Sequence, residues 1–409
     1  MKQRGLRKLL GILILVSVLF SFSSCALEGQ TENLTITGFA FDTTYTITLY
    51  QGGSQKILDS CIEKCSSYEK IFSRTQKASE LYQINEIEKL YEEKLVSDAL
   101  QSSLDRDEAI ILQESELQSA KTEEEAESRY LLAKRERITA YIEEKKSEEN
   151  KIEYELLEDD SISFQISDEL YDIIKKGLEY SKVSEGRFDI TVEPVTSLWD
   201  FKAENPVVPE EAAVKKALYR VGYEKLSLTK NALTIKEPGV GIDLGGIAKG
   251  FIADELKVYL EEQGVTGATI NLGGNLLCIG GKNEKEAFRI GIQQPFADRN
   301  ETITAVEVRD MSVVSSGIYE RYFETADGKL YHHIIDPKTG YSYENDLLGV
   351  TILSEKSVDG DALSTTCFAL GKDEGIKYID SLEGVYALFI TKDEKLWYSD
   401  GFQEFLMEE

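Results

Sequence analysis

The chain has 409 residues, of which 42% are hydrophobic and 29% charged, so it can bury a sizeable core in one large or two medium domains. Its formal net charge of −28 argues against nucleic acid as a partner, because a phosphate backbone is bound by clustered lysine and arginine. The five cysteines show neither C-x-x-C nor paired metal spacing, which excludes a disulfide framework.

Residues 1–24 have the pattern of an export signal, with a basic start and an apolar run at 9–20 that is too short for a stable membrane span. Small residues then precede Cys25, as in bacterial lipoprotein signals, where that cysteine carries the lipid. A simple secretory signal with an incidental cysteine is the alternative. Either interpretation predicts a folded part outside the cytoplasm, and a lipid on Cys25 would hold it at the membrane surface through a tether at 25–34.

Residues 34–50 alternate and are rich in Thr, Tyr and Ile, so they predict one strand. Residues 57–72 predict an amphipathic helix with two packing cysteines, and 79–85 predict a second short helical piece. Residues 88–160 contain no Gly or Pro and are dense in Glu, Lys, Gln and Ser. They predict a solvated helical hairpin or coiled coil, inserted between the two parts of one domain at 35–87 and 161–409. The insertion could contact a partner or act only as a spacer.

The rest of the chain alternates short strands with a few helices. Helices are predicted at 166–183, 209–218, 361–370 and 375–382, and strands at 226–228, 233–235, 267–281 (with a Gly-Gly turn), 288–292, 302–308, 311–315, 331–335, 349–353 and 385–390. These elements predict an α+β domain with a mostly antiparallel sheet.

A glycine-containing corner lies at 241–256. The pattern predicts a strand that enters the pair Gly245-Gly246 and a helix that follows it. Such a corner presents backbone N–H groups and a positive helix end to an anion such as a pyrophosphate. Asp243 and Lys249 flank it, as a hydroxyl or metal acceptor and as a phosphate counter-charge. A plain structural helix cap is the alternative.

Two further patterns carry possible chemistry. Asp361 and Thr365 are one helical turn apart, and two hard oxygen donors on one helix face suit Mg²⁺ with phosphates and waters. The alternative is that Asp361 and Ser364 only cap the helix. His332 and His333 are adjacent on a predicted strand, so they face opposite ways and cannot jointly chelate one metal, although one can face a site.

Eight segments, in order, resemble motifs of the ApbE family, the bacterial FAD:protein FMN transferases. The resemblance covers residues 35–86 and 162–400. The segments are FDTTYTI near residue 41, SELYQIN near 79, GRFDITVEP near 186, GIDLGGIAKG at 241, GATINLGGN at 267, SSGIYERYF at 315, HHIIDPKTG at 332 and DALSTT at 361.

The resemblance implies an ApbE-like α+β fold, related to the T-fold, that binds FAD extended across it. It implies that the enzyme, with Mg²⁺, transfers FMN to a threonine hydroxyl of a target flavoprotein and releases AMP. The acceptor threonine would lie in a short Asp/Ser/Thr motif. Ser364 stands where some members have a second aspartate, and Phe41-Asp42 stands where many have Met-Gly.

The resemblance also implies roles for single residues. The implied metal ligands are Asp361, Thr365 and the backbone carbonyl of Gly246 or Ala248, and His333 matches a histidine proposed to assist the transfer. The implied FAD contacts are Phe41, Thr75, Arg187, Phe188, Asp189, Asp243, Lys249 and Ile335.

Three other functions stay open on the sequence alone. The same site could hydrolyse FAD to FMN and AMP, with water in place of the threonine. The chain could instead be a non-catalytic flavin- or solute-binding surface lipoprotein, or a structural surface protein that assembles through its insertion. The Asp361/Thr365 pair weighs against a mere binder, which has no need of a metal at the diphosphate.

Overall fold

The computed structural model describes residues 33–104, 123–298 and 300–407, so the predicted export signal and Cys25 lie outside the described residues. Among the helices within these ranges, none is both long and apolar enough to cross a membrane.

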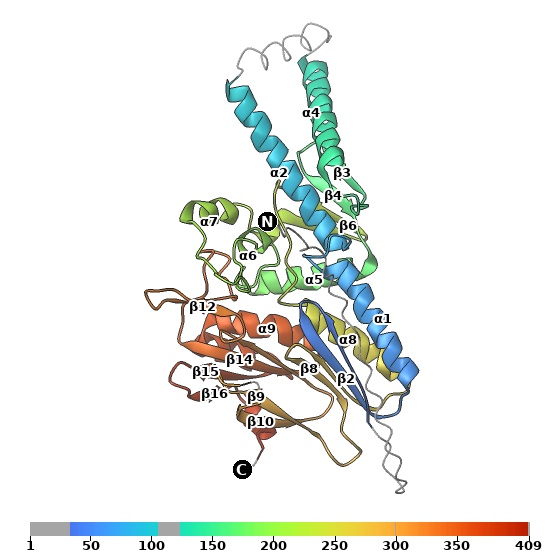
Figure 1. Ribbon diagram of the computed structural model, residues 1–409, viewed down its shortest axis with the longest axis vertical. Coiled ribbons are helices and arrows are strands. Elements are labelled where there is room, and N and C mark those ends of the chain that lie inside the picture. The colour runs from blue at the N-terminus through green and yellow to red at the C-terminus, as the bar shows by residue number, and fades with distance from the viewer. Residues whose placement is uncertain (1–32, 105–122, 299, 408–409) are drawn as a thin grey trace, which may run out of the picture. The chain divides into compact units, whose positions relative to one another are not determined.

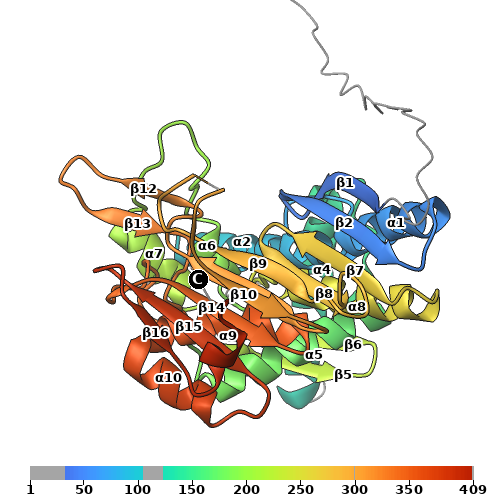
Figure 2. The same ribbon diagram turned by 90° about the horizontal axis from the view of Figure 1, so that it is seen from below.

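The centre of the fold is an eight-stranded sheet in which every neighbouring pair is antiparallel. This confirms the predicted α+β class. The strand order is β1 (Leu34–Ala40), β2 (Thr43–Gln51), β7 (Gly267–Leu272), β8 (Asn275–Gly280), β11 (Ser312–Gly317), β14 (Leu347–Ser354), β15 (Tyr386–Thr391) and β16 (Leu396–Tyr398). Figure 2 shows these strands from β1 at one edge to β16 at the other.

Two helices cover one face of this sheet. They are α8 (Ala248–Glu262) and α9 (Ser357–Leu370), which pack side by side, with α1 (Gln55–Phe72) against α8 (Figure 1) and α10 (Lys372–Asp380) against α9 (Figure 2). Every residue of strand β14 is buried. Its side chains belong to a hydrophobic core that also contains residues of α9, β9 (Phe288–Gln293) and β10 (Thr302–Val308). Both helices pack on the middle strands of the sheet, α8 on β7 and β8 and α9 on β11 and β14.

A second sheet and a helical hairpin lie beyond these helices. The sheet has the order β3 (Tyr154–Leu156), β4 (Ile162–Gln165), β6 (Ala232–Ile235) and β5 (Leu226–Thr229), next to α5 (Asp168–Val183). The hairpin is formed by α2 (Glu80–Leu104) and α4 (Glu123–Lys145), which project from the body in Figure 1. The predicted boundary at residue 88 falls inside α2, which is continuous. Tyr91 and Ile138 are buried at the base of the hairpin, whereas Leu100 and Leu132 farther out are exposed.

The remaining elements are short. They are α6 (Glu193–Thr196), α7 (Glu211–Leu218), η1 (Tyr223–Lys225), β12 (Tyr322–Glu324), β13 (Leu330–His332) and η2 (Phe402–Phe405). Trp199 follows α6 and stacks on Phe201, and its Nε1 donates to the Gly340 carbonyl at 3.0 Å. A small aromatic core is thereby built around Trp199.

Some local predictions were wrong. The strand predicted at 331–335 ends at His332, so His333 lies beyond it. Residues 34–50 are a hairpin, because Phe41 and Asp42 both adopt positive φ, 55° and 61°, and turn the chain back between β1 and β2. Residues 240–242 do not form a strand and make only a single bridge at Gly241. The side chain of Asn85 takes the place of a neighbouring strand there, since it accepts from the Ile242 N–H at 2.8 Å and donates to the Ile242 carbonyl at 2.9 Å.

Four cysteines lie in the described part of the chain, and all are buried free thiols. Cys61 and Cys65 pack in the core beneath α1, as predicted. Burial raises the pKa of Cys61 to about 11 and the pKa values of Cys65 and Cys278 to about 12. The fourth, Cys367, lies on α9.

Candidate functional site

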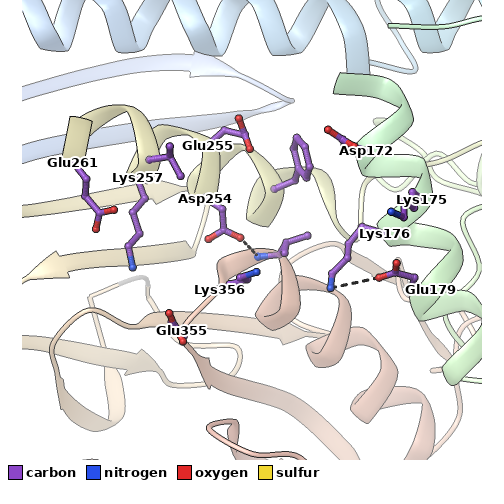
Figure 3. A pocket seen from close by; sticks show the side chains of 13 residues that line it. Asp172, Lys175, Lys176, Glu179, Asp254, Glu255, Lys257, Glu261, Glu355 and Lys356 are labelled. Atoms are coloured by element: carbon purple, nitrogen blue, oxygen red, sulfur yellow. Dashed lines mark hydrogen bonds and ion pairs between the residues drawn. The ribbon is translucent and has the colours of Figure 1, made fainter. Parts of the chain in front are cut away.

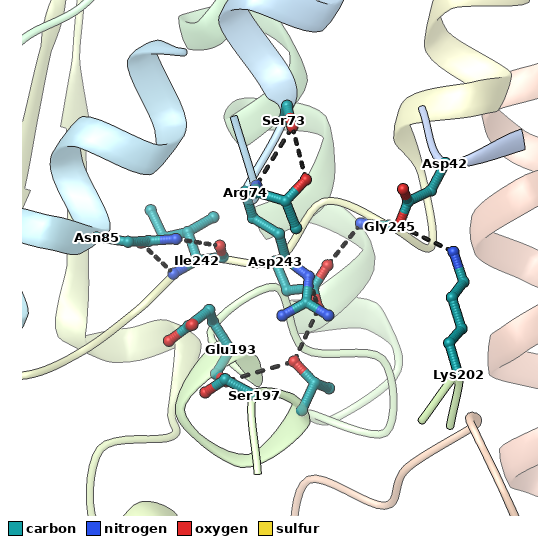
Figure 4. Close-up of polar contacts among 12 residues, drawn as sticks. Asp42, Ser73, Arg74, Asn85, Glu193, Ser197, Lys202, Ile242, Asp243 and Gly245 are labelled. Carbon is teal, nitrogen blue, oxygen red and sulfur yellow. Dashed lines mark hydrogen bonds and ion pairs between the residues drawn. The ribbon is translucent and has the colours of Figure 1, made fainter. Parts of the chain in front are cut away.

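Asp243 organises the corner that leads into α8. One of its carboxylate oxygens accepts from the Gly245 N–H at 2.8 Å, and the other accepts from Thr196 Oγ1 at 2.8 Å. Arg74 Nε lies 3.4 Å from this second oxygen (Figure 4). Asp243 therefore reaches the predicted corner, but both oxygens already have partners within the protein. The Gly245 amide is likewise engaged by Asp243.

Arg74 is a site residue that sequence reasoning missed. The neighbouring Thr75, predicted to contact FAD, is in an exposed turn after α1, where Ser73 is its sole hydrogen-bond partner among the described residues. Arg74 instead points toward Asp243 in Figure 4. Burial, and next the charge of Asp243, raise the pKa of Glu193, whereas Arg74 acts in the opposite direction. Arg74 thus supplies positive charge between two carboxylates, and no local motif indicates this.

Asp361 lies where α9 crosses the start of α8. Its Oδ2 accepts from the Gly250 N–H at 3.0 Å, and its Oδ1 lies 3.4 Å from Lys249 Nζ. Its side chain is only 4% exposed, compared with 28% for Lys249. The alternative of Asp361 as a cap for its own helix was wrong, because α9 begins one turn earlier, at Ser357. Asp361 instead binds the first turn of α8.

Thr365 lies one turn beyond Asp361 and faces Gly246. A Cβ at Gly246 would lie 3.8 Å from Thr365 Oγ1 and 3.0 Å from Phe188 Cε2, so the three residues are close neighbours. The Thr365 hydroxyl forms no hydrogen bond within the described residues. Ser364, by contrast, is engaged with Ser316 Oγ at 2.7 Å and with the Asp361 carbonyl at 2.8 Å. Thr365 therefore has a hydroxyl that is available to a ligand.

The chemistry of these donors suits a magnesium ion better than a transition metal. No group of three or more His, Cys, Asp or Glu able to hold a metal occurs within the described ranges. What α8 and α9 bring together is one carboxylate, one hydroxyl and the nearby main chain of Gly246. Mg²⁺ is commonly held by one or two carboxylates, with substrate phosphates and waters completing its octahedron. The residues present therefore fit Mg²⁺ together with a phosphorylated ligand.

The two histidines have different environments. His332 is buried, with Nε2 3.0 Å from the Tyr343 carbonyl and Nδ1 accepting from the Ile334 N–H, and burial lowers its pKa to about 4. In His333, Nδ1 is buried and has no hydrogen-bond partner within the described residues. Burial, followed by the positive charge of Arg321, lowers the pKa of His333 to about 3. His333 is thus a neutral imidazole with a free nitrogen, whereas His332 is used by the fold.

The predicted segment 187–189 lies beside the corner, but its members differ in what they can offer. Phe188 is buried and packs under Gly246. Asp189 is committed to its own loop, where it accepts from the Thr191 N–H at 2.8 Å, from the Thr191 hydroxyl at 2.7 Å and from the Tyr223 N–H at 3.1 Å. Arg187 is 35% exposed and its side chain lies 3.4 Å from Glu185. Only Arg187 keeps a partly exposed polar head.

Phe41 and Ile335, the remaining predicted contacts, come from distant parts of the chain. Phe41 is at the β1–β2 turn, where its N–H donates to Glu69 at 3.0 Å and the adjacent Asp42 pairs with Lys202 at 3.0 Å (Figure 4). Ile335 is buried in the aromatic core around Trp199. At the corner, Gly246 lies against Phe188 and Thr365, Lys249 contacts Asp361, and Asp243 contacts Gly245.

Comparison with known proteins identifies what this architecture is similar to. A family model described as "ApbE family" matches residues 125–389. An FAD:protein FMN transferase of Klebsiella pneumoniae is 37% identical over 233 residues, which are 56% of this chain and 72% of that protein. One of Treponema pallidum is 34% identical over 247 residues, 57% of this chain and 68% of that protein.

Solved structures show the same fold. The flavin transferase ApbE of Vibrio cholerae matches with a TM-score of 0.67 at 22% identity, covering 92% of this chain and 99% of that one. The ApbE protein of Thermotoga maritima matches with a TM-score of 0.67 at 25% identity, covering 92% of this chain and 100% of that one.

Proposed function

The chain belongs to the ApbE family, and on that basis we propose that it is an FAD:protein FMN transferase. It transfers the FMN portion of FAD to a threonine hydroxyl of a protein acceptor, with Mg²⁺, and releases AMP. The acceptor is a flavoprotein whose threonine lies in a short Asp/Ser/Thr motif, so the product is a covalently flavinylated protein.

The observation that carries the proposal is the contact between Asp361 and the start of α8. It brings a nearly buried carboxylate, the unbonded hydroxyl of Thr365 and the ammonium of Lys249 together beside the Gly246 corner. A diphosphate needs positive charge, hydrogen-bond donors and a metal held by hard oxygen ligands. A protein that only bound flavin would have no use for this set of groups.

Asp361, Thr365 and the main chain at Gly246 or Ala248 would hold Mg²⁺, which when bound neutralises phosphate charge and polarises the phosphoryl oxygens. Lys249 offsets the negative charge that develops on the departing AMP. The acceptor oxygen forms a bond to the FMN phosphorus, while the bond from that phosphorus to the bridging oxygen breaks and its electron pair leaves with AMP. Residues at the corner thus position the diphosphate and stabilise charge.

His333 is the candidate acceptor for the threonine proton. His332 is unsuited, because both of its ring nitrogens already have partners. His333 has a free Nδ1 and is neutral at physiological pH because burial lowers its pKa. A neutral imidazole can accept a proton, and the anionic phosphates of a bound FAD favour the imidazolium that results.

We also propose that a lipid on Cys25 anchors the enzyme to the outer face of a bacterial cell membrane. The support is the sequence pattern of residues 1–25. The mass of the mature N-terminal peptide tests this, since an unmodified residue 25, or a chain cleaved elsewhere, would contradict it.

The decisive experiment incubates the purified chain with FAD, Mg²⁺ and a candidate acceptor, followed by mass spectrometry of the acceptor peptides. We expect addition of FMN to one threonine, loss of the product with EDTA, and no product when that threonine is replaced by valine. Release of FMN and AMP at the same rate without acceptor would show the hydrolase instead. A chain that binds no FAD at millimolar Mg²⁺ would leave only the alternatives that need no flavin, a solute-binding lipoprotein or a structural surface protein.

A further inference from the structure

The helices α8 and α9 begin beside one another. The residues that precede them, Ile247 and Lys356, provide no side-chain cap for the first turn. The first N–H groups of a helix have no partner within the helix and need one from elsewhere when they are buried. Each of these two helices obtains its partner from the other.

The two caps are reciprocal. From α8, Asp254 accepts from the Ser357 N–H at 2.8 Å and from the Val358 N–H at 2.9 Å, both in the first turn of α9. From α9, Asp361 accepts from the Gly250 N–H at 3.0 Å, in the first turn of α8. Gly250 and Asp254 are one turn apart on α8, and Ser357 and Asp361 are one turn apart on α9, so the helices are antiparallel and the two caps use the same contact surface. Figure 3 shows Asp254 pointing from α8 to the start of α9.

The contact between these helices leaves no spare room. A Cβ at Gly250 would lie 2.3 Å from the Ser357 carbonyl oxygen and 2.6 Å from Val358 Cα. The backbones are therefore in direct contact at this point. A change in the register of α9 on α8 would break the bonds of Asp254 and Asp361 together, because both acids bridge the same two helices.

We propose that Asp254 is a positioning residue for the flavin-transfer site: by capping α9 from α8 it fixes the carboxylate of Asp361 where the metal is held. This inference rests on the proposed function. Asp254 does not touch substrate or metal in this assignment, because its partners are Ser357 and Val358, at least three residues before Asp361. It acts through the register of α9.

Other contacts at the start of α9 join it to different elements. The Ser357 hydroxyl donates to Asn275 on β8 at 2.6 Å, and Asp359 accepts from the Tyr180 hydroxyl of α5 at 2.7 Å. These bonds hold the first turn against the sheet and α5, whereas the reciprocal caps join it directly to α8. We therefore expect the effect of removing Asp254 to be specific to the geometry at Asp361.

The charged groove beside Asp254 supplies a matched control. This groove, of about 450 Å³, lies between α5, α8 and the loop before α9 (Figure 3). Glu261 is an acid on the same helix, lines the same groove and is exposed. Its side chain forms no hydrogen bond or ion pair within the described residues. Glu261→Gln therefore removes a similar charge from the groove without changing either cap.

The test compares Asp254→Ala, Asp254→Asn and Glu261→Gln in full-length enzyme, with transfer rates measured against Mg²⁺ concentration. For Asp254→Ala we expect the Mg²⁺ concentration at half-maximal rate to rise about 10- to 100-fold, as for partners that orient metal ligands. The maximal rate at saturating Mg²⁺ should change less than about threefold, because the ligands themselves are intact. Asp254→Asn keeps one amide oxygen as an acceptor and should lie between Ala and wild type. Glu261→Gln should match wild type.

Amide hydrogen exchange separates this inference from the flavin chemistry. It needs neither FAD nor activity, and Asp254→Ala should accelerate exchange at residues 357–358 and at 250 at least tenfold, whereas Glu261→Gln should not. Faster exchange in a protein that never transfers flavin would support the reciprocal caps and refute the proposed function. An unchanged Mg²⁺ requirement, or equal loss of maximal rate in all Asp254 variants, overturns the positioning role. If Asp254→Ala does not fold, the same two measurements on Asp254→Asn decide.

Discussion

Gly250→Ala tests the contact between α8 and α9 most directly. In an isolated helix this change is favourable by about 1 kcal/mol, because alanine loses less conformational entropy than glycine. In this protein the new Cβ would meet the Ser357 carbonyl oxygen at 2.3 Å, whereas ordinary contact begins near 3.4 Å. Both groups in the clash are backbone or fixed to backbone, so no side chain can move aside.

The loss of stability follows from how far α8 and α9 must move apart to admit the new Cβ. Moving the helices apart by about 1 Å lengthens the Asp254 and Asp361 hydrogen bonds, now 2.8–3.0 Å, to nearly 4 Å, which is beyond hydrogen-bond range. Losing two or more bonds to charged acceptors costs about 3–6 kcal/mol, and the helix-forming preference of alanine offsets about 1 kcal/mol. We therefore expect the free energy of unfolding to decrease by about 2–5 kcal/mol.

Urea unfolding monitored by tryptophan fluorescence measures this free energy, since Trp199 is buried in the small aromatic core. Val258→Ala is the matched control, because Val258 is on the same helix and 52% exposed, and its replacement should change the free energy of unfolding by less than about 0.5 kcal/mol. If Gly250→Ala is as stable as wild type and requires no more Mg²⁺, the close packing and its link to Asp361 are refuted.

Three further predictions concern the site and its titration. Asp361→Ala should abolish Mg²⁺-dependent FMN transfer while the chain still folds. Asp361→Asn can still accept from the Gly250 N–H, so it should be equally inactive but more stable than Asp361→Ala. Mg²⁺-dependent labelling retained in both variants would refute the metal assignment. His333→Ala should bind FAD normally in a fluorescence titration but transfer FMN about 10²–10⁴-fold more slowly, and undiminished turnover would remove His333 from the mechanism. Burial lowers the pKa of His332 to about 4, below its unfolded value near 6.5, so the unfolded chain binds more protons between these two pH values. The free energy of unfolding is therefore unaffected by His332 above pH 6.5 and decreases as the pH falls, by about 2 kcal/mol at pH 5. The urea midpoints at pH 7 and pH 5 should differ less in His332→Gln than in wild type, although His333, whose pKa burial also lowers, keeps part of the difference; an unchanged pH slope would contradict the assignment.

Local patterns in the sequence predicted the elements that local forces decide. The Gly273-Gly274 turn between β7 and β8 and the Lys230-Asn231 turn between β5 and β6 carry residues that accept positive φ, and both hairpins form where expected. The antiparallel α+β class followed from many short strands joined by such turns. The turn at Phe41-Asp42 was missed because neither residue is a usual member of a tight hairpin turn.

The contacts that were missed join residues far apart in the chain. Asn85 supplies the hydrogen bonds that a neighbouring strand would give to Ile242, and Asp361 caps a helix more than 100 residues before it. Arg74 reaches Asp243 only because the end of α1 is brought beside the corner. Spacing along the chain cannot reveal such pairs. The family resemblance identified Asp243 and Asp361 as site residues. It did not show that Asp243 also binds Thr196 and Arg74, or that Asp361 also accepts from the Gly250 N–H.

The four buried thiols can report local unfolding of the elements that contain them. A thiol-specific reagent cannot reach Cys61, Cys65, Cys278 or Cys367 while the fold is closed, and burial keeps the thiols of the first three protonated at neutral pH. Labelling therefore proceeds only through fluctuations that expose the sulfur. Cys367 lies two residues beyond Thr365, so its labelling rate relative to that of Cys61 on α1 reports how firmly α9 is held. Ligand occupancy could be followed in this way on unmodified protein, with no introduced probe.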